Sequence, residues 1–291
     1  MNVVSLFDGI SGLAVALKKS NIPTTKYYAS EVDKHAIKVS AEHFPDIERL
    51  GDVREVAYIP GVDLLCGGSP CQDLSIAKPG REGLEGAKSS LFWEYVRLKT
   101  LLCPKWFILE NVASMHKDDR DIITKEMGVE PIMINASHFS AQSRKRLFWT
   151  NIPVDMSHLP VSDAVVADIL EKDVSNKSIS VASQPFAVRE IKRKSVKSQC
   201  LCLGKIGDGK FSTGNRVYST DGKSGCLTTG RSEWYNVGGL IRRLTPVEAE
   251  RLQGLPDGYT QSVSKTQRLH GVGNGFNVDV IAFILSFIPR P

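Results

Sequence analysis

The first half of the chain alternates short apolar runs with amphipathic stretches, and this alternation leaves few folds open to it. The runs that predict strands are residues 2–7, 27–30, 47–50, 62–66, 106–109, 131–136 and 146–150. Helical patterns lie between them, and Leu91, Tyr95, Leu98 and Leu102 fall on one helix face. Strands and helices alternating through short connections predict an α/β fold with a mostly parallel sheet covered on both faces.

Polar and reactive residues follow the predicted strand ends. They are Phe7, Asp8, Gly9, Glu31, Asp52, Pro70, Cys71, Glu110 and Asn111. Parallel sheets bind ligands beyond the carboxyl ends of their strands. We therefore expect these residues to line one site.

The first of these strand ends has features of a nucleoside site. Residues 6–13, LFDGISGL, form a glycine turn between a strand and a helix but lack the G-x-G-x-x-G spacing of a dinucleotide fingerprint. Glu31 suits ribose hydroxyls, and Asp52 could accept a hydrogen bond from an adenine amino group. The pattern favours a nucleoside cofactor without a pyrophosphate, and ordinary loop acids are the alternative.

Cys71 lies in the glycine-rich stretch GGSPCQDLSIAKPG (67–80) and is either a small buried spacer or a nucleophile. A thiol at a strand end near helix N-termini can have a lowered pKa. Glu110 is expected on a neighbouring strand, and a thiolate beside a carboxyl group suits addition to a polarised ring. The three cations of QSRKR (142–146) could hold a carbonyl oxygen or a phosphate, or form a solvated basic turn.

Residues 151–234 differ in texture, with short β runs between turns rich in Gly, Ser, Thr and Lys. They predict a small β-rich module inserted into the first domain. Residues 184–243 hold twelve Lys or Arg and four Asp or Glu, a net +8, so the rest of this +5 chain carries −3. This asymmetry indicates a surface for a polyanion, and a solvated insertion is the alternative.

Two further elements follow the inserted module. A helix is predicted after Thr245 and Pro246, which suit the cap and first turn. A glycine turn is predicted within residues 271–275, before a final apolar stretch that we assign to the core of the first domain.

The sequence also excludes several classes of protein. No apolar stretch approaches the ~20 residues of a membrane span, and the N-terminal residues do not resemble a signal peptide. The six cysteines include no C-x-x-C pair, which argues against a zinc ribbon or a thioredoxin-type site. We expect a protein of the reducing cytoplasm, with no metal.

The motifs SLFDGISG, SEVD, GDVREV, GGSPCQDLS, LENV, QSRKR, RRLTPVEAERLQGLPDGY and GVGNGFNV, in this order, resemble those of the DNA (cytosine-5)-methyltransferases. The resemblance covers essentially the whole chain and is to compact bacterial or phage members. SIAKPGREGLEG after Cys71 also resembles the vertebrate de novo branch.

The family resemblance implies a Rossmann-like S-adenosylmethionine-dependent methyltransferase fold with an inserted, β-rich target-recognition domain. We expect residues 1–153 and 262–291 to form the catalytic and cofactor-binding domain, and residues 154–261 to form the recognition domain and hinge.

The resemblance further implies roles for single residues. Cys71 would attack C6 of a cytosine flipped out of double-stranded DNA, and Glu110, next to Asn111, would engage N3 and the exocyclic amine. Arg144 would contact O2, and Arg146 would support the catalytic loop or a phosphate. Residues 75–90 would close over DNA and be mobile without it.

The cofactor implied by the resemblance is S-adenosyl-L-methionine, which would be converted to S-adenosyl-L-homocysteine. The residues implied to line it are Phe7, Asp8, Gly9, Ser11, Glu31, Val32, Asp52, Val53, Pro70, Leu91, Asn274 and Phe276.

Arg216 would read a base edge, such as that of guanine. Ser219, Thr228 and Gln142 are the other expected DNA contacts. The family often has Thr where this chain has Cys226, and Thr228 could substitute for it. A restriction endonuclease could act separately on the same target, and we expect the protein to be a monomer.

Three alternatives stay open at this point. One branch of the family methylates transfer RNA, but the Cys-Phe-Thr element usual in that branch is absent here. A non-enzymatic DNA-binding relative would not need Cys71, Glu110 and Arg144. A dehydrogenase would need the missing glycine fingerprint. The DNA target sequence does not follow from the residues.

Overall fold

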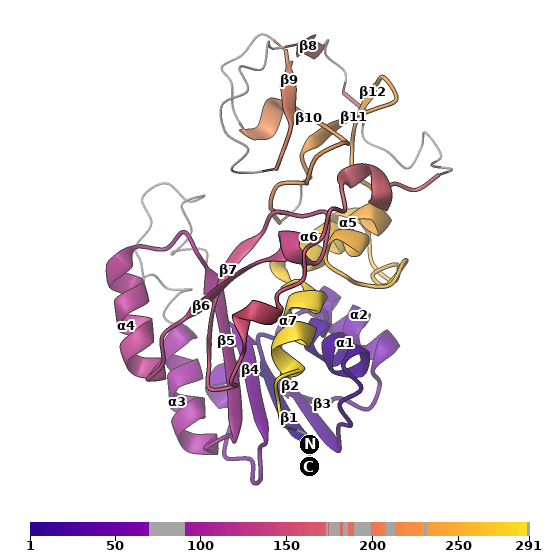
Figure 1. Ribbon diagram of the computed structural model, residues 1–291. Helices are drawn as coiled ribbons and strands as arrows, with labels where there is room; N and C mark the ends of the chain where they lie inside the picture. The colour runs from indigo at the N-terminus through magenta and orange to yellow at the C-terminus, as the bar shows by residue number, and fades with distance from the viewer. Residues whose placement is uncertain are drawn as a thin grey trace. The chain divides into compact units, whose positions relative to one another are not determined.

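Figure 1 shows the computed structural model, which describes residues 1–69, 91–172, 174, 181–182, 186–188, 199–207, 213–229 and 232–289. Pro70, Cys71 and residues 75–90, for which we expected a closing loop, lie outside the described residues. Contacts divide the chain into two compact units. Unit 1 comprises residues 1–134, 145–158 and 280–291, and unit 2 comprises residues 135–144 and 159–279.

Unit 1 contains a seven-stranded sheet in the order β3-β2-β1-β4-β5-β7-β6. Its strands are β1 (Asn2–Leu6), β2 (Lys26–Ser30), β3 (Glu48–Gly51), β4 (Leu64–Gly68), β5 (Trp106–Val112), β6 (Ile132–Asn135) and β7 (Lys145–Thr150). The five strands from β3 to β5 are parallel, and β7 is antiparallel to β5. The predicted α/β fold with a mostly parallel sheet is confirmed.

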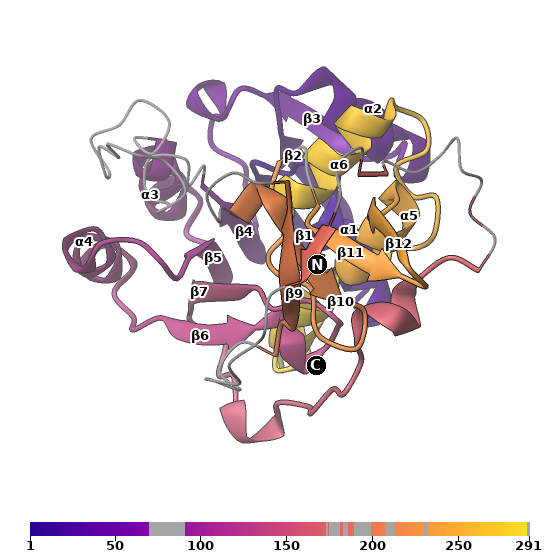
Figure 2. The ribbon, with the colours of Figure 1, turned by 90° about the horizontal axis from the view of Figure 1, so that it is seen from above.

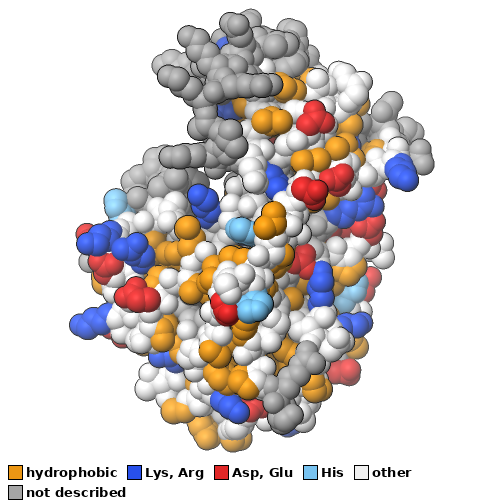
Figure 3. Space-filling view, in the orientation of Figure 1, with side chains coloured by type: hydrophobic (Ala, Val, Ile, Leu, Met, Phe, Trp, Pro, Cys, Tyr) orange, Lys and Arg blue, Asp and Glu red, His pale blue; other side chains and the backbone are white. Residues whose placement is uncertain are grey.

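The helices of unit 1 follow the predicted alternation. They are α1 (Gly12–Lys19), α2 (Lys34–His43), α3 (Phe92–Leu102), α4 (Lys117–Met127) and α7 (Val278–Leu285). In Figures 1 and 2, α3 and α4 lie beside the part of the sheet that holds β4, β5 and β7. Basic and acidic side chains are interspersed over α4 in the space-filling view of Figure 3, as its sequence KDDRDIITKEM requires.

The core of unit 1 follows from the apolar runs. Strands β1 and β4 are buried almost throughout, because helices cover both faces of a parallel sheet. Helix α3 contributes Phe92, Tyr95 and Leu98, each fully buried, to the same cluster as Leu65 and Leu109. This core fixes β4 and β5 side by side, and most of the predicted chemistry lies on them.

Within its described residues, unit 2 contains a five-stranded sheet in the order β12-β11-β10-β9-β8 and the two α-helices α5 and α6. The elements are β8 (Phe186–Val188), β9 (Cys202–Ile206), β10 (Arg216–Ser219), β11 (Trp234–Val237), β12 (Leu240–Arg243), α5 (Pro246–Leu252) and α6 (Lys265–Asn274). Helix α5 begins as predicted: Thr245 accepts a hydrogen bond from the backbone of Glu248, whose carboxylate bonds back to the Thr245 N–H. The predicted β-rich insertion thus exists, and its division into functional domains stays a prediction.

The predicted glycine turn at 271–275 is wrong in its position. Gly271 and Gly273 lie inside α6, which ends at Asn274, and Gly275 is its C-terminal cap. A Cβ atom on Gly273 would lie 2.5 Å from the carbonyl oxygen of Thr228. Glycine is needed there for close backbone packing and not for a turn.

No helix within the described residues is long and apolar enough to cross a membrane.

Candidate active site

The carboxyl ends of β1, β2 and β3 are neighbours, and the residues predicted to line a nucleoside cofactor follow them. Phe7, Gly9 and Ser11 all have left-handed backbone, with φ of 56°, 58° and 59°. The Glu31 carboxylate accepts hydrogen bonds of 2.8 Å from the backbone of Gly9, Val32 and Asp33. Glu31 therefore ties the β1 turn to the β2 turn.

Asp8 is directed into the protein. Its carboxylate is buried and accepts hydrogen bonds from Ser11 and, at 2.7 Å, from the Tyr27 hydroxyl, while Arg49 lies 4.0 Å away. Burial raises the pKa of Asp8, and these partners offset part of that rise. The buried Asp8 carboxylate therefore holds the turn after β1 from its protein side. No sequence pattern had indicated that Tyr27 would be its partner.

The remaining predicted cofactor residues differ in exposure. Asp52 forms a two-atom contact with the Arg54 guanidinium, which lowers its pKa to about 2. Val53 is buried, whereas the apolar side chain of Val32 is 70% exposed. Leu91 precedes α3, and Asn274 and Phe276 belong to unit 2.

Glu110 and Arg146 form an ion pair within the sheet of unit 1. Arg146 Nε lies 2.7 Å from Glu110 Oε1, and each side chain is 14% exposed. Glu110 stands opposite Gly68 in the β4–β5 register, and a Cβ atom on Gly68 would lie 2.9 Å from Glu110 Oε2. Because Gly68 has no side chain, β4 leaves room for the Glu110 carboxylate. Glu110 and Asn111 lie within β5 and not at its end as predicted.

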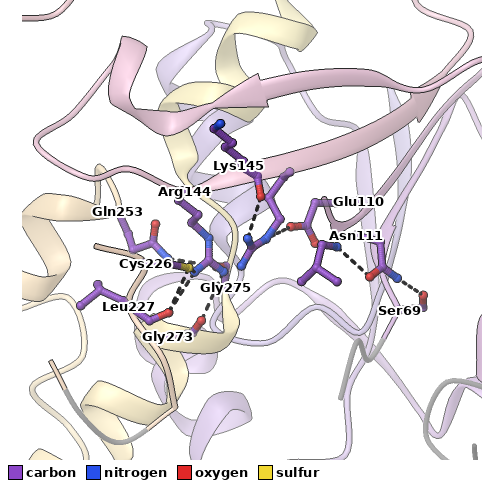
Figure 4. A network of polar contacts seen from close by, with 12 residues as sticks. Ser69, Glu110, Asn111, Arg144, Lys145, Cys226, Leu227, Gln253, Gly273 and Gly275 are labelled. Atoms are coloured by element: carbon purple, nitrogen blue, oxygen red, sulfur yellow. Dashed lines mark hydrogen bonds and ion pairs between the residues drawn. The ribbon is translucent and has the colours of Figure 1, made fainter. Parts of the chain in front are cut away.

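Asn111 joins β5 to the last described residue before the 70–90 gap. Its buried side-chain amide donates to Ser69 Oγ at 3.2 Å, and its carbonyl oxygen accepts from the Val112 backbone at 2.7 Å (Figure 4). Ser69 is itself buried. Ser69 was not predicted, although its position two residues before Cys71 could have indicated it.

Arg144 belongs to unit 2 and is almost fully buried, with 4% exposure. Its guanidinium donates to the carbonyl oxygens of Leu227 (3.1 Å), Gly275 (2.8 Å) and Gly273 (3.3 Å), as Figure 4 shows. It also lies 3.1 Å from the Cys226 sulfur. Arg144 therefore anchors protein backbone in this structure.

Gln142 is buried in unit 2, as Arg144 is. Its side chain is fully buried, accepts from the Leu227 backbone at 3.2 Å and donates to the Leu252 carbonyl at 3.3 Å. The backbones of Ser143 and Ser224 are also hydrogen-bonded at 2.8 Å. The expected DNA contact of Gln142 does not agree with this burial, because no surface of its side chain is open to a duplex.

The other expected DNA-contacting residues lie on or near β10. Arg216 is partly exposed at the start of this strand, and Thr228 is exposed. Ser219 Oγ bonds with Asp221 at 2.9 Å and so closes the turn that follows β10. Glu233, which lies close to Arg216, was not predicted.

Cys66 differs from the predicted nucleophile. It is buried in β4, and burial raises the pKa of its thiol far above the usual range, so it remains a neutral core residue. Among the described residues no group of three His, Cys, Asp or Glu side chains is arranged to hold a metal ion.

Comparison with known proteins gives one consistent result. The model of the family "C-5 cytosine-specific DNA methylase" matches residues 1–290. The type II methyltransferase M.HhaI of Haemophilus parahaemolyticus is 26% identical over 98% of this chain and 93% of its own length. M.HpaII of Haemophilus parainfluenzae is 27% identical, over 96% and 86%.

Solved structures share the fold. A prophage-encoded protein of E. coli, described as a DNA modification methyltransferase, superposes with a TM-score of 0.68 at 21% identity, over 99% of this chain and 98% of its own. Dnmt2 of S. pombe gives 0.65 at 16% identity, over 98% and 97%.

Proposed function

This chain belongs to the family of C-5 cytosine-specific DNA methylases, and from that membership we propose how its residues methylate DNA. It is a DNA (cytosine-5)-methyltransferase of a family that uses S-adenosyl-L-methionine. We propose that it acts on a cytosine flipped out of a specific double-stranded sequence, because a duplex stacks the reacting carbons out of reach.

In the proposed reaction the Cys71 thiolate bonds to C6 of the cytosine. Protonated Glu110 gives its proton to N3, accepts a hydrogen bond from the exocyclic amine, and so neutralises the charge that addition places on the ring. N3 returns this proton when the C6–S bond breaks. S-adenosyl-L-methionine supplies the methyl group that C5 receives. The C5 proton then leaves to a base, the C6–S bond breaks, and Cys71 returns as thiolate.

The ion pair of Glu110 and Arg146 is the observation that carries this proposal. Glu110 lies one residue from Asn111, which is hydrogen-bonded to Ser69. Cys71 is two residues beyond Ser69 in the sequence, and β4, which ends just before Ser69, pairs with the strand that holds Glu110.

We assign the O2 contact to Arg146 and not, as the resemblance first implied, to Arg144. Arg146 pairs with Glu110, whereas the Arg144 donors are directed at carbonyl oxygens of unit 2. A guanidinium beside the carboxylate that holds N3 can also reach the adjacent ring oxygen. Arg144 then fixes the backbone at Leu227, in the segment that follows β10. Asn111 positions Ser69 through its hydrogen bond.

The residues at the ends of β1 to β3 fit an adenosine group. Glu31 uses its oxygens for backbone N–H groups yet retains lone pairs for ribose hydroxyls. Val32 offers an exposed apolar surface against which a purine can pack. The exposed Asp52–Arg54 pair is of a weak kind that an adenine amine can open. As the resemblance implies, we propose as further contacts Phe7, Gly9, Val53, Pro70, Leu91, Asn274 and Phe276.

We further propose that Arg216 reads a base edge and that Ser219 and Thr228 contact the DNA backbone. The relatives named type II methyltransferases support a role beside a separate restriction endonuclease. We propose that the protein acts as a monomer in the cytoplasm.

Bisulfite sequencing of DNA from a host that expresses the protein tests this function. We expect protected cytosines within one short sequence for the wild type and none for Cys71→Ala. Cys66→Ala is the matched control, since its buried thiol has no role in the reaction, and it should retain the pattern. Absence of protected cytosines, or labelling of transfer RNA alone by purified protein, would contradict the proposal.

A further inference from the structure

Unit 2 contains a carboxylate that the proposed reaction does not use. Glu233 precedes β11, and its Oε2 accepts a hydrogen bond of 2.9 Å from the Gly225 backbone. The Tyr235 hydroxyl lies 3.0 Å from the same oxygen and 2.8 Å from Ser224 Oγ. One carboxylate oxygen is thus fixed to the segment that follows β10.

Gly225 is shaped to accept this side chain. A Cβ atom on Gly225 would lie 2.7 Å from the carboxyl carbon of Glu233, closer than real Cβ contacts come. Only glycine lets the backbone approach the carboxylate so closely. Residue 225 and Glu233 therefore form one packed unit.

The Glu233 carboxylate is linked to Arg216 through Tyr218. Strands β10 and β11 run parallel, with Val217 opposite Trp234 and Tyr218 opposite Tyr235, so Arg216 at the start of β10 lies beside Glu233. The Tyr218 hydroxyl interacts with both side chains. Burial raises the pKa of Tyr218 to about 12, so it remains a neutral hydroxyl that can accept from Arg216 and donate to Glu233. Burial raises the pKa of Glu233, and the hydrogen bonds it accepts and the charge of Arg216 offset part of that rise.

We infer that Glu233 is a specificity-determining residue that positions Arg216, an inference that rests on the proposed reading of a base edge by Arg216. A long arginine side chain loses much rotamer freedom when it binds, and a partner that orients it beforehand reduces that loss. The negative charge has a second effect. It weakens the attraction of Arg216 for phosphates, which carry no sequence information.

The two effects predict opposite changes on Glu233→Gln. The amide retains the shape and the contact to Gly225 but loses the charge. Discrimination among sequences should fall about tenfold, as for a weakened base contact. Affinity for poly(dA)·poly(dT), a duplex without cytosine, should rise about twofold to tenfold, because Arg216 is freed for phosphates.

The experiment uses the full chain and a library of duplexes with randomised sequence. Each variant methylates the library, and bisulfite sequencing gives the methylated fraction for every sequence context. The variants are Glu233→Gln, Arg216→Ala, the double variant and Tyr218→Phe. We expect Glu233→Gln and Tyr218→Phe to broaden the preference, and the double variant to be no broader than Arg216→Ala alone.

Glu250→Gln is the matched control. Glu250 is also a glutamate of unit 2 that accepts from backbone N–H groups and pairs with an arginine, Arg268, at 2.9 Å. It should lower the melting temperature without altering sequence preference. If it broadens the preference as much as Glu233→Gln, general loosening of unit 2 is the cause and the inference is overturned.

The outcomes separate this inference from the function on which it rests. An unchanged preference in Arg216→Ala removes the base-reading role and the inference together. A broadened preference in Arg216→Ala with wild-type preference in Glu233→Gln removes only the inference. If Glu233→Gln does not fold, as judged by its melting curve, a folded Tyr218→Phe with wild-type preference overturns the inference instead.

Discussion

At the scale of single residues, the pairing of Arg146 with Glu110 is the contact most directly tied to chemistry. Arg146→Ala leaves a largely buried carboxylate without its cation, and we expect the single-turnover rate of methyl transfer to fall at least about 100-fold. The free energy of unfolding should also drop, by about 3 kcal/mol, because an uncompensated buried charge remains.

The measurements are rapid-quench methyl transfer and urea unfolding. Arg120→Ala is the control, since the Arg120 side chain is 44% exposed and its contact with Asp121 is a surface pair. If Arg146→Ala transferred methyl groups at the wild-type rate, Arg146 would have no role in the reaction.

Asp8 predicts a dependence of stability on pH. Burial raises its pKa above the usual 3.8, so the folded protein holds the Asp8 proton more tightly than the unfolded chain does. The contribution of Asp8 to stability is fully present below 3.8 and is lost as the pH rises through the raised value. We therefore expect wild type to lose stability relative to Asp8→Asn as the pH rises above 3.8 and through the raised pKa.

Urea unfolding of both proteins across this range gives the difference directly. Equal pH profiles, or a difference of opposite sign, would mean that Tyr27, Ser11 and Arg49 compensate fully for the burial of Asp8.

At the scale of elements, the β4–β5 pair predicts a change that affects activity more than stability. A Cβ atom on Gly68 would displace the end of the Glu110 side chain, which is flexible. We expect Gly68→Ala to lower the rate about tenfold to 100-fold, as a misplacement of about 1 Å can.

Steady-state kinetics and a melting curve separate the two effects for Gly68→Ala. Gly214→Ala is the control, because its Cβ would meet nothing within 4 Å. A large loss of melting temperature with normal kcat would show that Gly68 serves packing alone.

The elements of unit 1 could be predicted from the sequence because periodicity reports burial. Strands β1, β2, β4, β5 and β7 begin and end within three residues of their predicted bounds, and α3 begins one residue after Leu91, the first residue of the predicted helix face. Long-range contacts could not be predicted in this way. Position 273 of α6 needs glycine because the Thr228 backbone lies against it, and no local sequence pattern predicts that contact.

The candidate site was predictable in its residue types but less so in its pairings. The motif QSRKR predicted that two arginines matter, yet Arg144 precedes β7, which begins at Lys145, so its side chain does not follow the alternation of the strand. Arg146 meets Glu110 in unit 1, and Arg144 meets carbonyl oxygens in unit 2. Glu233 lies in no motif and was missed, since its role depends on Tyr218 and Gly225 meeting it in the fold.

At the scale of the whole molecule, the charge asymmetry predicts how binding responds to salt. The segment 184–243 carries a net +8. If about six of these cations contact phosphates, affinity for duplex DNA should fall about 1000-fold between about 50 and 200 mM salt.

Fluorescence anisotropy with labelled poly(dA)·poly(dT) measures this slope. Binding of S-adenosyl-L-methionine, followed by calorimetry over the same range, is the control and should change little, because the residues proposed to hold it are mostly outside the basic segment. A flat response of DNA binding would contradict the assignment of this segment to DNA.

The attachment of residues 141–144 to the segment after β10 has a consequence for how new specificities can arise. Gln142, Ser143 and Arg144 bind that segment through the backbone of Ser224 and Leu227, and Arg144 also contacts the Cys226 sulfur. Every amino acid offers the same carbonyl and N–H groups, so side chains of the segment can be replaced without loosening this attachment. Gly225 is the exception, because it must change together with Glu233. Grafting of foreign recognition segments should succeed when a graft carries both residues as a pair.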